Sequence, residues 1–130
     1  IAHSRWGVAM GDYLAAVDGH LVCNLLIETA EAVENIAEIC AVPGIDLITP
    51  AQFDLSTALG ISGQFEHPDF IAAVSKIEAA ANAAAIPLAG VGLSHAQAKA
   101  AFAKGYRVIA GFDILWLKAK AAEAQSWTQD

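Results

Sequence analysis

Four short apolar runs, each followed by a stretch with helical features, constrain the fold of this chain more than any other feature. The runs cover residues 21–27, 45–49, 86–91 and 106–110. Nearly continuous apolar strands are typical of a parallel sheet whose strands are buried on both faces. Alternation of strand and helix requires right-handed crossovers between parallel strands. The sequence therefore predicts an α/β fold of four strand–helix units.

Local sequence signals predict the first two helices of this pattern. Residues 30–41 place apolar side chains at helical spacing, with Thr29 as the N-cap and Pro43-Gly44 as the stop. Residues 69–85 form an alanine-rich helix that ends before a proline. Residues 50–68, rich in Pro, Gly and Ser, are expected to form a loop.

The last third of the chain and its first twenty residues complete the pattern. Ser94-His95-Ala96-Gln97 is a capping box, and Gly105 ends the helix that it opens. Residues 112–125 are predicted to form a last amphipathic helix. The first twenty residues are expected to be irregular, apart from a short helix over residues 13–17.

The size of the chain leaves two architectures open. Units of this length are typical of a βα barrel, but four of them cannot close an eight-stranded barrel. The chain is therefore either a small doubly wound sheet or half of a barrel. With 130 residues, 29 alanines and a hydrophobic fraction of 56%, it is apolar for a small domain. This composition, with a start at Ile1, suggests part of a larger fold or a subunit with large buried interfaces.

Composition also excludes several classes of protein. The net charge of −7 argues against nucleic acid and against an anionic membrane surface as partners. No apolar run approaches the length that spans a bilayer, and no signal peptide is visible. Cys23 and Cys40 lie in apolar segments and are expected to be reduced core residues, which favours a cytoplasmic protein.

Two carboxylates follow neighbouring strands of the predicted sheet. Glu28 comes directly after the first run, and Asp54 lies in the loop after the second. In parallel α/β folds the carboxyl ends of the strands carry the chemistry, so the two side chains can converge there. Oxygen ligands with open positions suit a hard divalent cation that keeps several waters. On spacing alone, a metal site and a pair of helix-capping carboxylates fit this pattern equally well.

Segments around these carboxylates resemble the HpcH/HpaI aldolases, which are metal-dependent (class II) pyruvate aldolases such as 4-hydroxy-2-oxo-heptane-1,7-dioate aldolase. The resemblance extends over essentially the whole chain. It is most specific in Leu26-Ile27-Glu28-Thr29 with residues 31–39, which have the pattern EAxxNIxEI, and it is weaker in the later part of the chain. The other matching segments are Ser4-Arg5-Trp6, Asp12-Tyr13-Leu14, residues 42–46, Phe53-Asp54-Leu55-Ser56 and His67-Pro68.

This resemblance implies a (β/α)₈ TIM barrel of roughly twice the present size. Residues 1–130, taken as a single domain, resemble its carboxyl half, with strands five to eight. The catalytic histidine of the family, and the arginine that faces the substrate oxygens, belong to the amino half. No catalytic residue is identified in this chain, because none of its histidines takes a strand-end position: His3, His20, His67 and His95.

The resemblance also implies a site. Glu28 and Asp54 match the two ligands of a divalent metal ion, Mg²⁺, Mn²⁺ or Co²⁺. The turn Ala51-Gln52-Phe53-Asp54, where Ala-Gln replaces the Gly-Pro of the family, would bind the carboxylate of pyruvate or another 2-oxo acid through its N–H groups. Phe53 is then expected to turn its ring away from the site. The metal would act as a Lewis acid on a pyruvate enolate while 4-hydroxy-2-oxo acids are cleaved or formed with an aldehyde.

Two alternatives to this function remain. One is a citrate-lyase-like or malyl-CoA-like carbon–carbon lyase of the same superfamily, and the other is a non-catalytic half-barrel assembly module. In either case a homo-oligomer, built on dimers up to a hexamer, or a companion half-barrel is expected. Trp116 and its apolar neighbours on the last helix are interpreted as an interface stripe.

The remaining polar and glycine positions are given structural roles. Asp46 lies at the amino end of its strand, the end of a barrel that serves stability. Asp113 is expected to be the N-cap of the last helix, and Gly90 and Gly92 to allow close packing of strand against helix. Asn24, inside an apolar strand, requires a hydrogen-bond partner.

Overall fold

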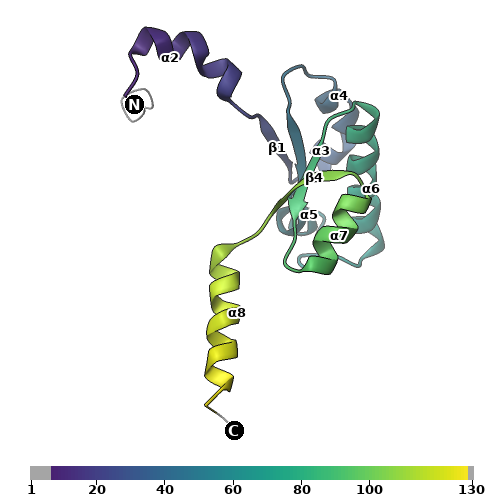
Figure 1. Ribbon diagram of the computed structural model, residues 1–130. Helices are drawn as coiled ribbons and strands as arrows, with labels where there is room; N and C mark the ends of the chain where they lie inside the picture. The colour runs from purple at the N-terminus through teal and green to yellow at the C-terminus, as the bar shows by residue number, and fades with distance from the viewer. Residues whose placement is uncertain (1–6, 129–130) are drawn as a thin grey trace.

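The computed structural model describes residues 7–128. Figure 1 shows a compact α/β body with a helix extending from it at each end. The elements follow one another in the order α2 (Met10–Ala16), the 3-10 helix η1 (Val17–His20), β1 (Asn24–Ile27), α3 (Ala30–Glu34), α4 (Ile36–Cys40), β2 (Leu47–Pro50), α5 (Gln52–Ala58), α6 (Pro68–Ala83), β3 (Leu88–Val91), α7 (His95–Ala103), β4 (Tyr106–Ala110) and α8 (Asp113–Ser126).

The four strands form one parallel sheet in the order β1-β2-β3-β4. The predicted alternation of strands and helices is therefore confirmed. Each strand lies beside the next one in the sequence, whereas a doubly wound sheet reverses its strand order at a switch point. Of the two architectures that the sequence leaves open, the strand order favours the winding of a barrel.

The core lies between the sheet and the helices, which cover one face of the sheet (Figure 1). Ile27, Ile48 and Leu88 point from the sheet into this layer and are at most 2% exposed. On the opposite face, Leu26 is 54% exposed and Val108 is 42% exposed. The prediction that the strands are buried on both faces is therefore wrong for β1 and β4, where no described helix packs on the second face. In β3, by contrast, Leu88, Ala89 and Gly90 are all buried.

Local capping explains where the helices begin and end. The Thr29 side chain accepts a hydrogen bond from the Ala32 N–H, as predicted for an N-cap. The Ser94 side chain accepts from the Gln97 N–H, and Gln97 Oε1 in return accepts from the Leu93 N–H, 2.8 Å away. The capping box is thus confirmed, with its reciprocal bond one residue earlier than in the standard pattern.

Three helical segments differ from the prediction. The single helix expected over residues 30–41 is divided into α3 and α4 at Asn35, whose φ of −91° and ψ of 11° depart from helical values. The expected loop 50–68 contains α5, which buries Leu55 against the core. Residues 10–20 are largely helical rather than irregular. Tertiary packing stabilises α5, since the Pro, Gly and Ser content of residues 50–68 alone predicts a loop.

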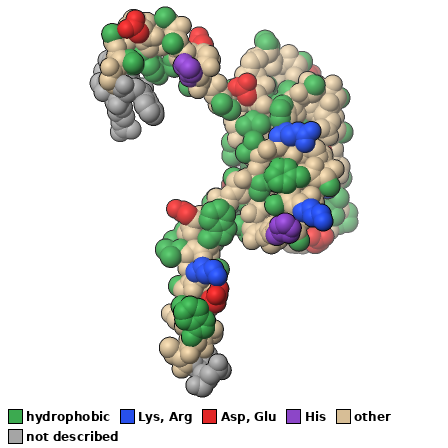
Figure 2. All heavy atoms as spheres, in the orientation of Figure 1, with side chains coloured by type: hydrophobic (Ala, Val, Ile, Leu, Met, Phe, Trp, Pro, Cys, Tyr) green, Lys and Arg blue, Asp and Glu red, His purple; other side chains and the backbone are tan. Residues whose placement is uncertain are grey.

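The helices α2 and α8 extend away from the body (Figure 1). Neither α2 nor α8 buries a residue. Figure 2 shows apolar side chains gathered along α8. The exposed ones include Ile114, Leu115, Trp116 and Leu117. Within residues 7–128, no helix combines the length and apolar character that crossing a membrane would need.

Both cysteines have free thiols, but their surroundings differ. Cys40 is buried, and burial raises the pKa of its thiol. Cys23 is exposed at the amino end of β1, so its prediction as a core residue is wrong. The apolar run 21–27 predicts a covering layer over this part of the sheet, but within the described residues no helix covers it.

Candidate functional site

Glu28 and Asp54 are placed by the two neighbouring strands β1 and β2. Glu28 directly follows β1, and Asp54 lies in the first turn of α5, which follows β2 after one residue. Ile27 and Pro50 are paired in register at the carboxyl ends of these strands. The Ala51 N–H also donates to the Ile27 carbonyl, with an N–O distance of 3.1 Å. The main chain therefore ties the turn before Asp54 to the residue before Glu28.

Both carboxylates are open to solvent and have no competing partner. Glu28 and Asp54 are exposed, and within residues 7–128 no hydrogen bond or ion pair engages either side chain. In the same part of the chain, no cluster of three or more His, Cys, Asp or Glu residues could hold a metal. A pair of carboxylates is a poor site for zinc, which takes three or four protein ligands. It fits a hard cation such as Mg²⁺ or Mn²⁺, which keeps several waters.

The turn that leads into α5 has free backbone donors. Ala51, the N-cap, has a φ of −80°, and no side chain caps α5. The N–H groups of Gln52, Phe53 and Asp54 are in the first turn of a helix, where no carbonyl of the helix can accept from them. Such donors favour an anion. Ala51, also expected to bind substrate, uses its own N–H to hold Ile27.

The surroundings of this turn are apolar. Phe53 is 62% exposed and covers none of the described core. Leu26, at the end of β1, and Leu93 and Phe112, which follow β3 and β4, are also exposed. The carboxyl edge of the sheet therefore presents two carboxylates among apolar side chains.

Asp46 and Asn24 take the structural roles that the sequence predicts, whereas Asp113 does not. Asp46 Oδ2 accepts from the Cys23 N–H at 2.8 Å, which joins the amino ends of β1 and β2. Thr49 Oγ1 donates to Asn24 Oδ1 at 2.8 Å, which supplies the expected partner. Asp113 is the first residue of α8 rather than its N-cap, and its carboxylate accepts from the adjacent Ile114 N–H.

Gly90 in β3 and Gly92 directly after it show why small residues are needed there. A Cβ on Gly90 would lie 2.8 Å from the ring of Tyr106, and a Cβ on Gly92 would lie 2.8 Å from Ile109 Cγ2 and 3.6 Å from α7. Both positions are therefore close-packed, as predicted.

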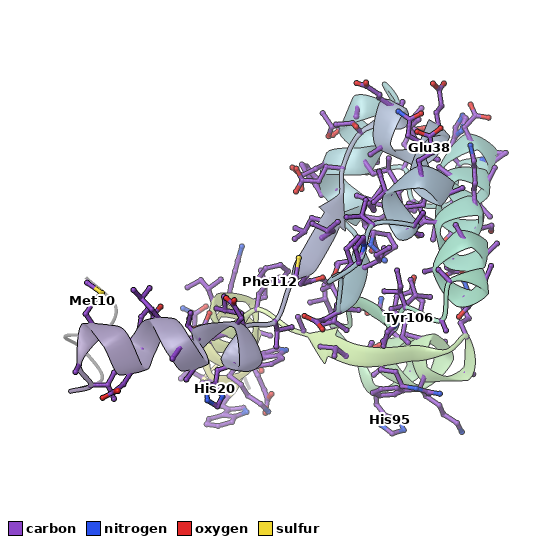
Figure 3. The ribbon with its side chains drawn as sticks, turned by 90° about the horizontal axis from the view of Figure 1, so that it is seen from above. Met10, His20, Glu38, His95, Tyr106 and Phe112 are labelled. Atoms are coloured by element: carbon purple, nitrogen blue, oxygen red, sulfur yellow. The ribbon has the colours of Figure 1, made fainter. Side chains whose placement is uncertain are left out.

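None of the described histidines directly follows a strand, as the sequence predicts. His20 ends η1, and His95 is the first residue of α7 (Figure 3). His67 is the N-cap of α6. The His67 imidazole accepts from the Asp69 N–H, which uses it in capping. His3 and the block Ser4-Arg5-Trp6 lie outside the described residues.

Three polar groups on the helix side were not singled out from the sequence. Tyr106 points from β4 into the helix layer (Figure 3), where its hydroxyl donates to Glu78 Oε1 at 2.9 Å. Lys104 Nζ lies 3.4 Å from the same oxygen. Burial and the Glu78 carboxylate raise the pKa of Tyr106. These residues line a cavity of about 590 Å³ between α6 and α7. No local pattern predicts this cluster, because its members are distant in sequence.

Comparison with known proteins identifies the family of the chain. The sequence model of the HpcH/HpaI aldolase/citrate lyase family matches residues 14–118. A hydroxypyruvate/pyruvate aldolase of Chromohalobacter salexigens is 34% identical over 124 residues, which cover 95% of this chain and 48% of that protein. A 4-hydroxy-2-oxo-heptane-1,7-dioate aldolase of Salmonella paratyphi B is 36% identical over 95 residues, covering 70% of this chain and 36% of that protein. The chain spans about half the length of the curated relatives it matches.

The fold agrees with these relatives. A crystal structure of an HpcH/HpaI aldolase/citrate lyase family protein from Burkholderia cenocepacia superposes with a TM-score of 0.84 at 27% identity, covering 92% of this chain and 47% of that chain. The four strand–helix units thus correspond to part of a TIM barrel, which confirms the predicted fold class.

Proposed function

The chain belongs to the HpcH/HpaI aldolase/citrate lyase family, and on that premise we propose that Glu28 and Asp54 hold the divalent metal of a pyruvate-dependent aldolase. The observation that carries the proposal is the Ala51–Ile27 hydrogen bond, which joins the backbone beside the two carboxylates at one edge of the sheet. Both carboxylates are exposed and unpaired within the described chain, so a cation meets no competing charge there.

The residues of the turn have distinct tasks in this proposal. The N–H groups of Gln52, Phe53 and Asp54 would hold the carboxylate of pyruvate or another 2-oxo acid at the start of α5. The bound ion would supply Lewis-acid stabilisation of negative charge on the keto oxygen. Glu28 and Asp54 would leave its other positions to water and substrate.

The reaction class that we propose is the cleavage or formation of 4-hydroxy-2-oxo acids, with an aldehyde as the second substrate. Proteins with the names of such aldolases are among the relatives of this chain. Within residues 7–128 no histidine or arginine stands directly after a strand, where it could transfer a proton at this edge. We therefore expect the base and the substrate-facing arginine to come from a part of the family barrel that this chain does not match.

An assembly is part of the proposal. The bare face of the sheet, with Leu26 and Val108, and the apolar side chains of α8 are exposed in the single chain. Among the described residues, β1 and β4 each have one unpaired edge, and open edges recruit further chains. We propose a homo-oligomer or a complex with a companion half-barrel. We also infer a cytoplasmic location from the two free cysteines.

Metal titration tests the proposed site. Mn²⁺ binding to the full chain, followed by the electron paramagnetic resonance of free Mn²⁺, is expected to weaken at least about tenfold in Glu28→Gln and in Asp54→Asn, since each change removes one of two charged ligands. Glu38→Gln is the matched control. Glu38 is exposed on α4 and lies away from Phe112 at the edge of the sheet (Figure 3). Equal affinity in all variants would contradict the metal assignment and favour a non-catalytic half-barrel module.

A further inference from the structure

Ser56 is buried in a way that a surface helix such as α5 does not require. Its side chain is 0% exposed, and it is the buried polar residue of the described core. It stands two residues after Asp54, in the second turn of α5. A buried hydroxyl is stable only where its hydrogen-bonding groups are satisfied. Its partners therefore indicate what the position is built to hold.

The hydroxyl of Ser56 connects two segments. Ser56 Oγ donates to the Phe53 carbonyl at 2.7 Å and accepts from the Gly63 N–H at 3.0 Å. The first bond is to the start of α5, and the second is to the loop between α5 and α6. One side chain thus fixes the distance between the loop and the first turn of the helix.

The Phe53 carbonyl is an informative partner. This carbonyl and the Asp54 N–H belong to one peptide unit and therefore lie in one plane. Thr57 Oγ1 also donates to this carbonyl, at 3.0 Å, and lies 2.8 Å from Ser62 Oγ. Two hydroxyls therefore orient the plane of the peptide that carries the Asp54 backbone into the candidate metal centre.

The loop that Ser56 holds is shaped for this contact. Gly60 has a φ of +76° and Gly63 a φ of +74°, in the left-handed region where glycine is favoured. The Ile61 N–H donates to the Ser56 carbonyl at 2.9 Å, and the Ile61 side chain packs against the core. The loop is thus anchored on one side in the core and on the other side at Ser56.

We propose that Ser56 is a positioning residue for the candidate metal centre, which sets the Phe53–Asp54 peptide by tying it to Gly63. This inference rests on the proposed function, because it assumes that Asp54 binds the metal. Without the hydroxyl, the Gly63 N–H and the Phe53 carbonyl each lose a partner, and the first turn of α5 gains freedom. Binding of the ion must then order a more mobile Asp54, and the entropic cost of this ordering lowers the affinity.

The test compares Mn²⁺ binding to the full chain in variants of one hydroxyl at a time. In Ser56→Ala we expect about three- to tenfold weaker Mn²⁺ binding, the fold-change that corresponds to one net hydrogen bond. Ser56→Cys keeps a weak donor and acceptor and is expected to restore part of the affinity. Ser62→Ala is the matched control. It removes an exposed hydroxyl that touches Thr57 and not the Phe53 carbonyl, so the affinity should stay within twofold.

A second readout does not depend on metal. Amide hydrogen exchange at Gly63, measured by NMR on the metal-free chain, is expected to accelerate in Ser56→Ala and not in Ser62→Ala, because the Gly63 N–H donates to Ser56 Oγ. A folded Ser56→Ala with wild-type affinity and wild-type exchange at Gly63 would overturn the inference. If Ser56→Ala does not fold, Ser56→Cys decides, since wild-type affinity and exchange there would also overturn it. If Glu28→Gln binds Mn²⁺ as tightly as the wild type does, the proposed metal centre is refuted, and this inference with it.

Discussion

Replacing Gly90 with alanine would bring a methyl group against the ring of Tyr106. The new Cβ would lie 2.8 Å from Cε1 and 3.0 Å from Cδ1 of that ring. Carbon atoms in favourable contact are about 3.5–4.0 Å apart, so the ring or the strand would have to move by several tenths of an ångström. The ring has little room to do so, because Tyr106 is 6% exposed and its hydroxyl is held by Glu78.

The expected cost follows from two opposing effects. Overpacking of a well-filled core typically costs about 1–3 kcal/mol. Alanine also has fewer unfolded conformations than glycine, which offsets about 0.4–1 kcal/mol where the native backbone suits both residues. Gly90 is not in the left-handed region, so this offset applies. We therefore expect Gly90→Ala to lower the free energy of unfolding by about 1–2 kcal/mol.

Urea unfolding followed by circular dichroism measures this change, and two further variants show its cause. Tyr106→Ala removes the ring, so adding Gly90→Ala to that background should cost less than about 0.5 kcal/mol. Gly11→Ala, whose new Cβ meets no atom within 4 Å, should not lower stability. A Gly90→Ala protein as stable as the wild type would refute the assignment of Gly90 to close packing. It would leave this strand end free for another role, such as binding phosphate.

Two further predictions concern pH and assembly. Because burial and Glu78 raise the pKa of Tyr106 above its ordinary value of 10.0, its contribution to stability is complete below pH 10 and is lost as the pH rises toward the folded pKa. Urea unfolding above pH 10 should therefore show a decline that is smaller in Tyr106→Phe, and an unchanged decline in that variant would contradict the assignment. Light scattering on the chain should show an oligomer or, with a companion half-barrel, a complex, because Leu26, Val108 and the apolar side chains of α8 are exposed. A monomer that unfolds cooperatively would argue for a self-contained α/β domain.

Much of the architecture could be predicted from local sequence, because its signals are local. The apolar run of β4 gives the strand bounds that the structure shows, and Thr29 and Ser94 cap the helices that follow β1 and β3. The α5 helix was missed since its stability comes from the burial of Leu55 and Ser56, which depends on contacts with distant parts of the chain. The exposed face of the sheet was missed for a related reason. An apolar run indicates that a strand will be covered, but it does not say by what.

Only part of the candidate site could be predicted from the sequence. Strand-end positions alone bring Glu28 and Asp54 to one edge, and the structure supplies the Ala51–Ile27 bond that links their backbones. That bond also changes the expected task of Ala51, whose N–H is engaged within the fold. The hydroxyls of Ser56 and Thr57 could not be given a role from sequence, because their partners include a loop whose glycine conformations emerge only in the folded chain.

The central claim is that Glu28 and Asp54 together bind a divalent ion, and anomalous diffraction from crystals soaked in Mn²⁺ tests it most directly. The proposal predicts one strong anomalous peak within coordination distance of both carboxylates, lost in Glu28→Gln crystals under the same conditions. Pyruvate or oxamate added to the soak should then appear beside that peak, with its carboxylate at the start of α5. A well-ordered structure in which the two carboxylates diverge, or in which manganese binds only elsewhere, would contradict the claim.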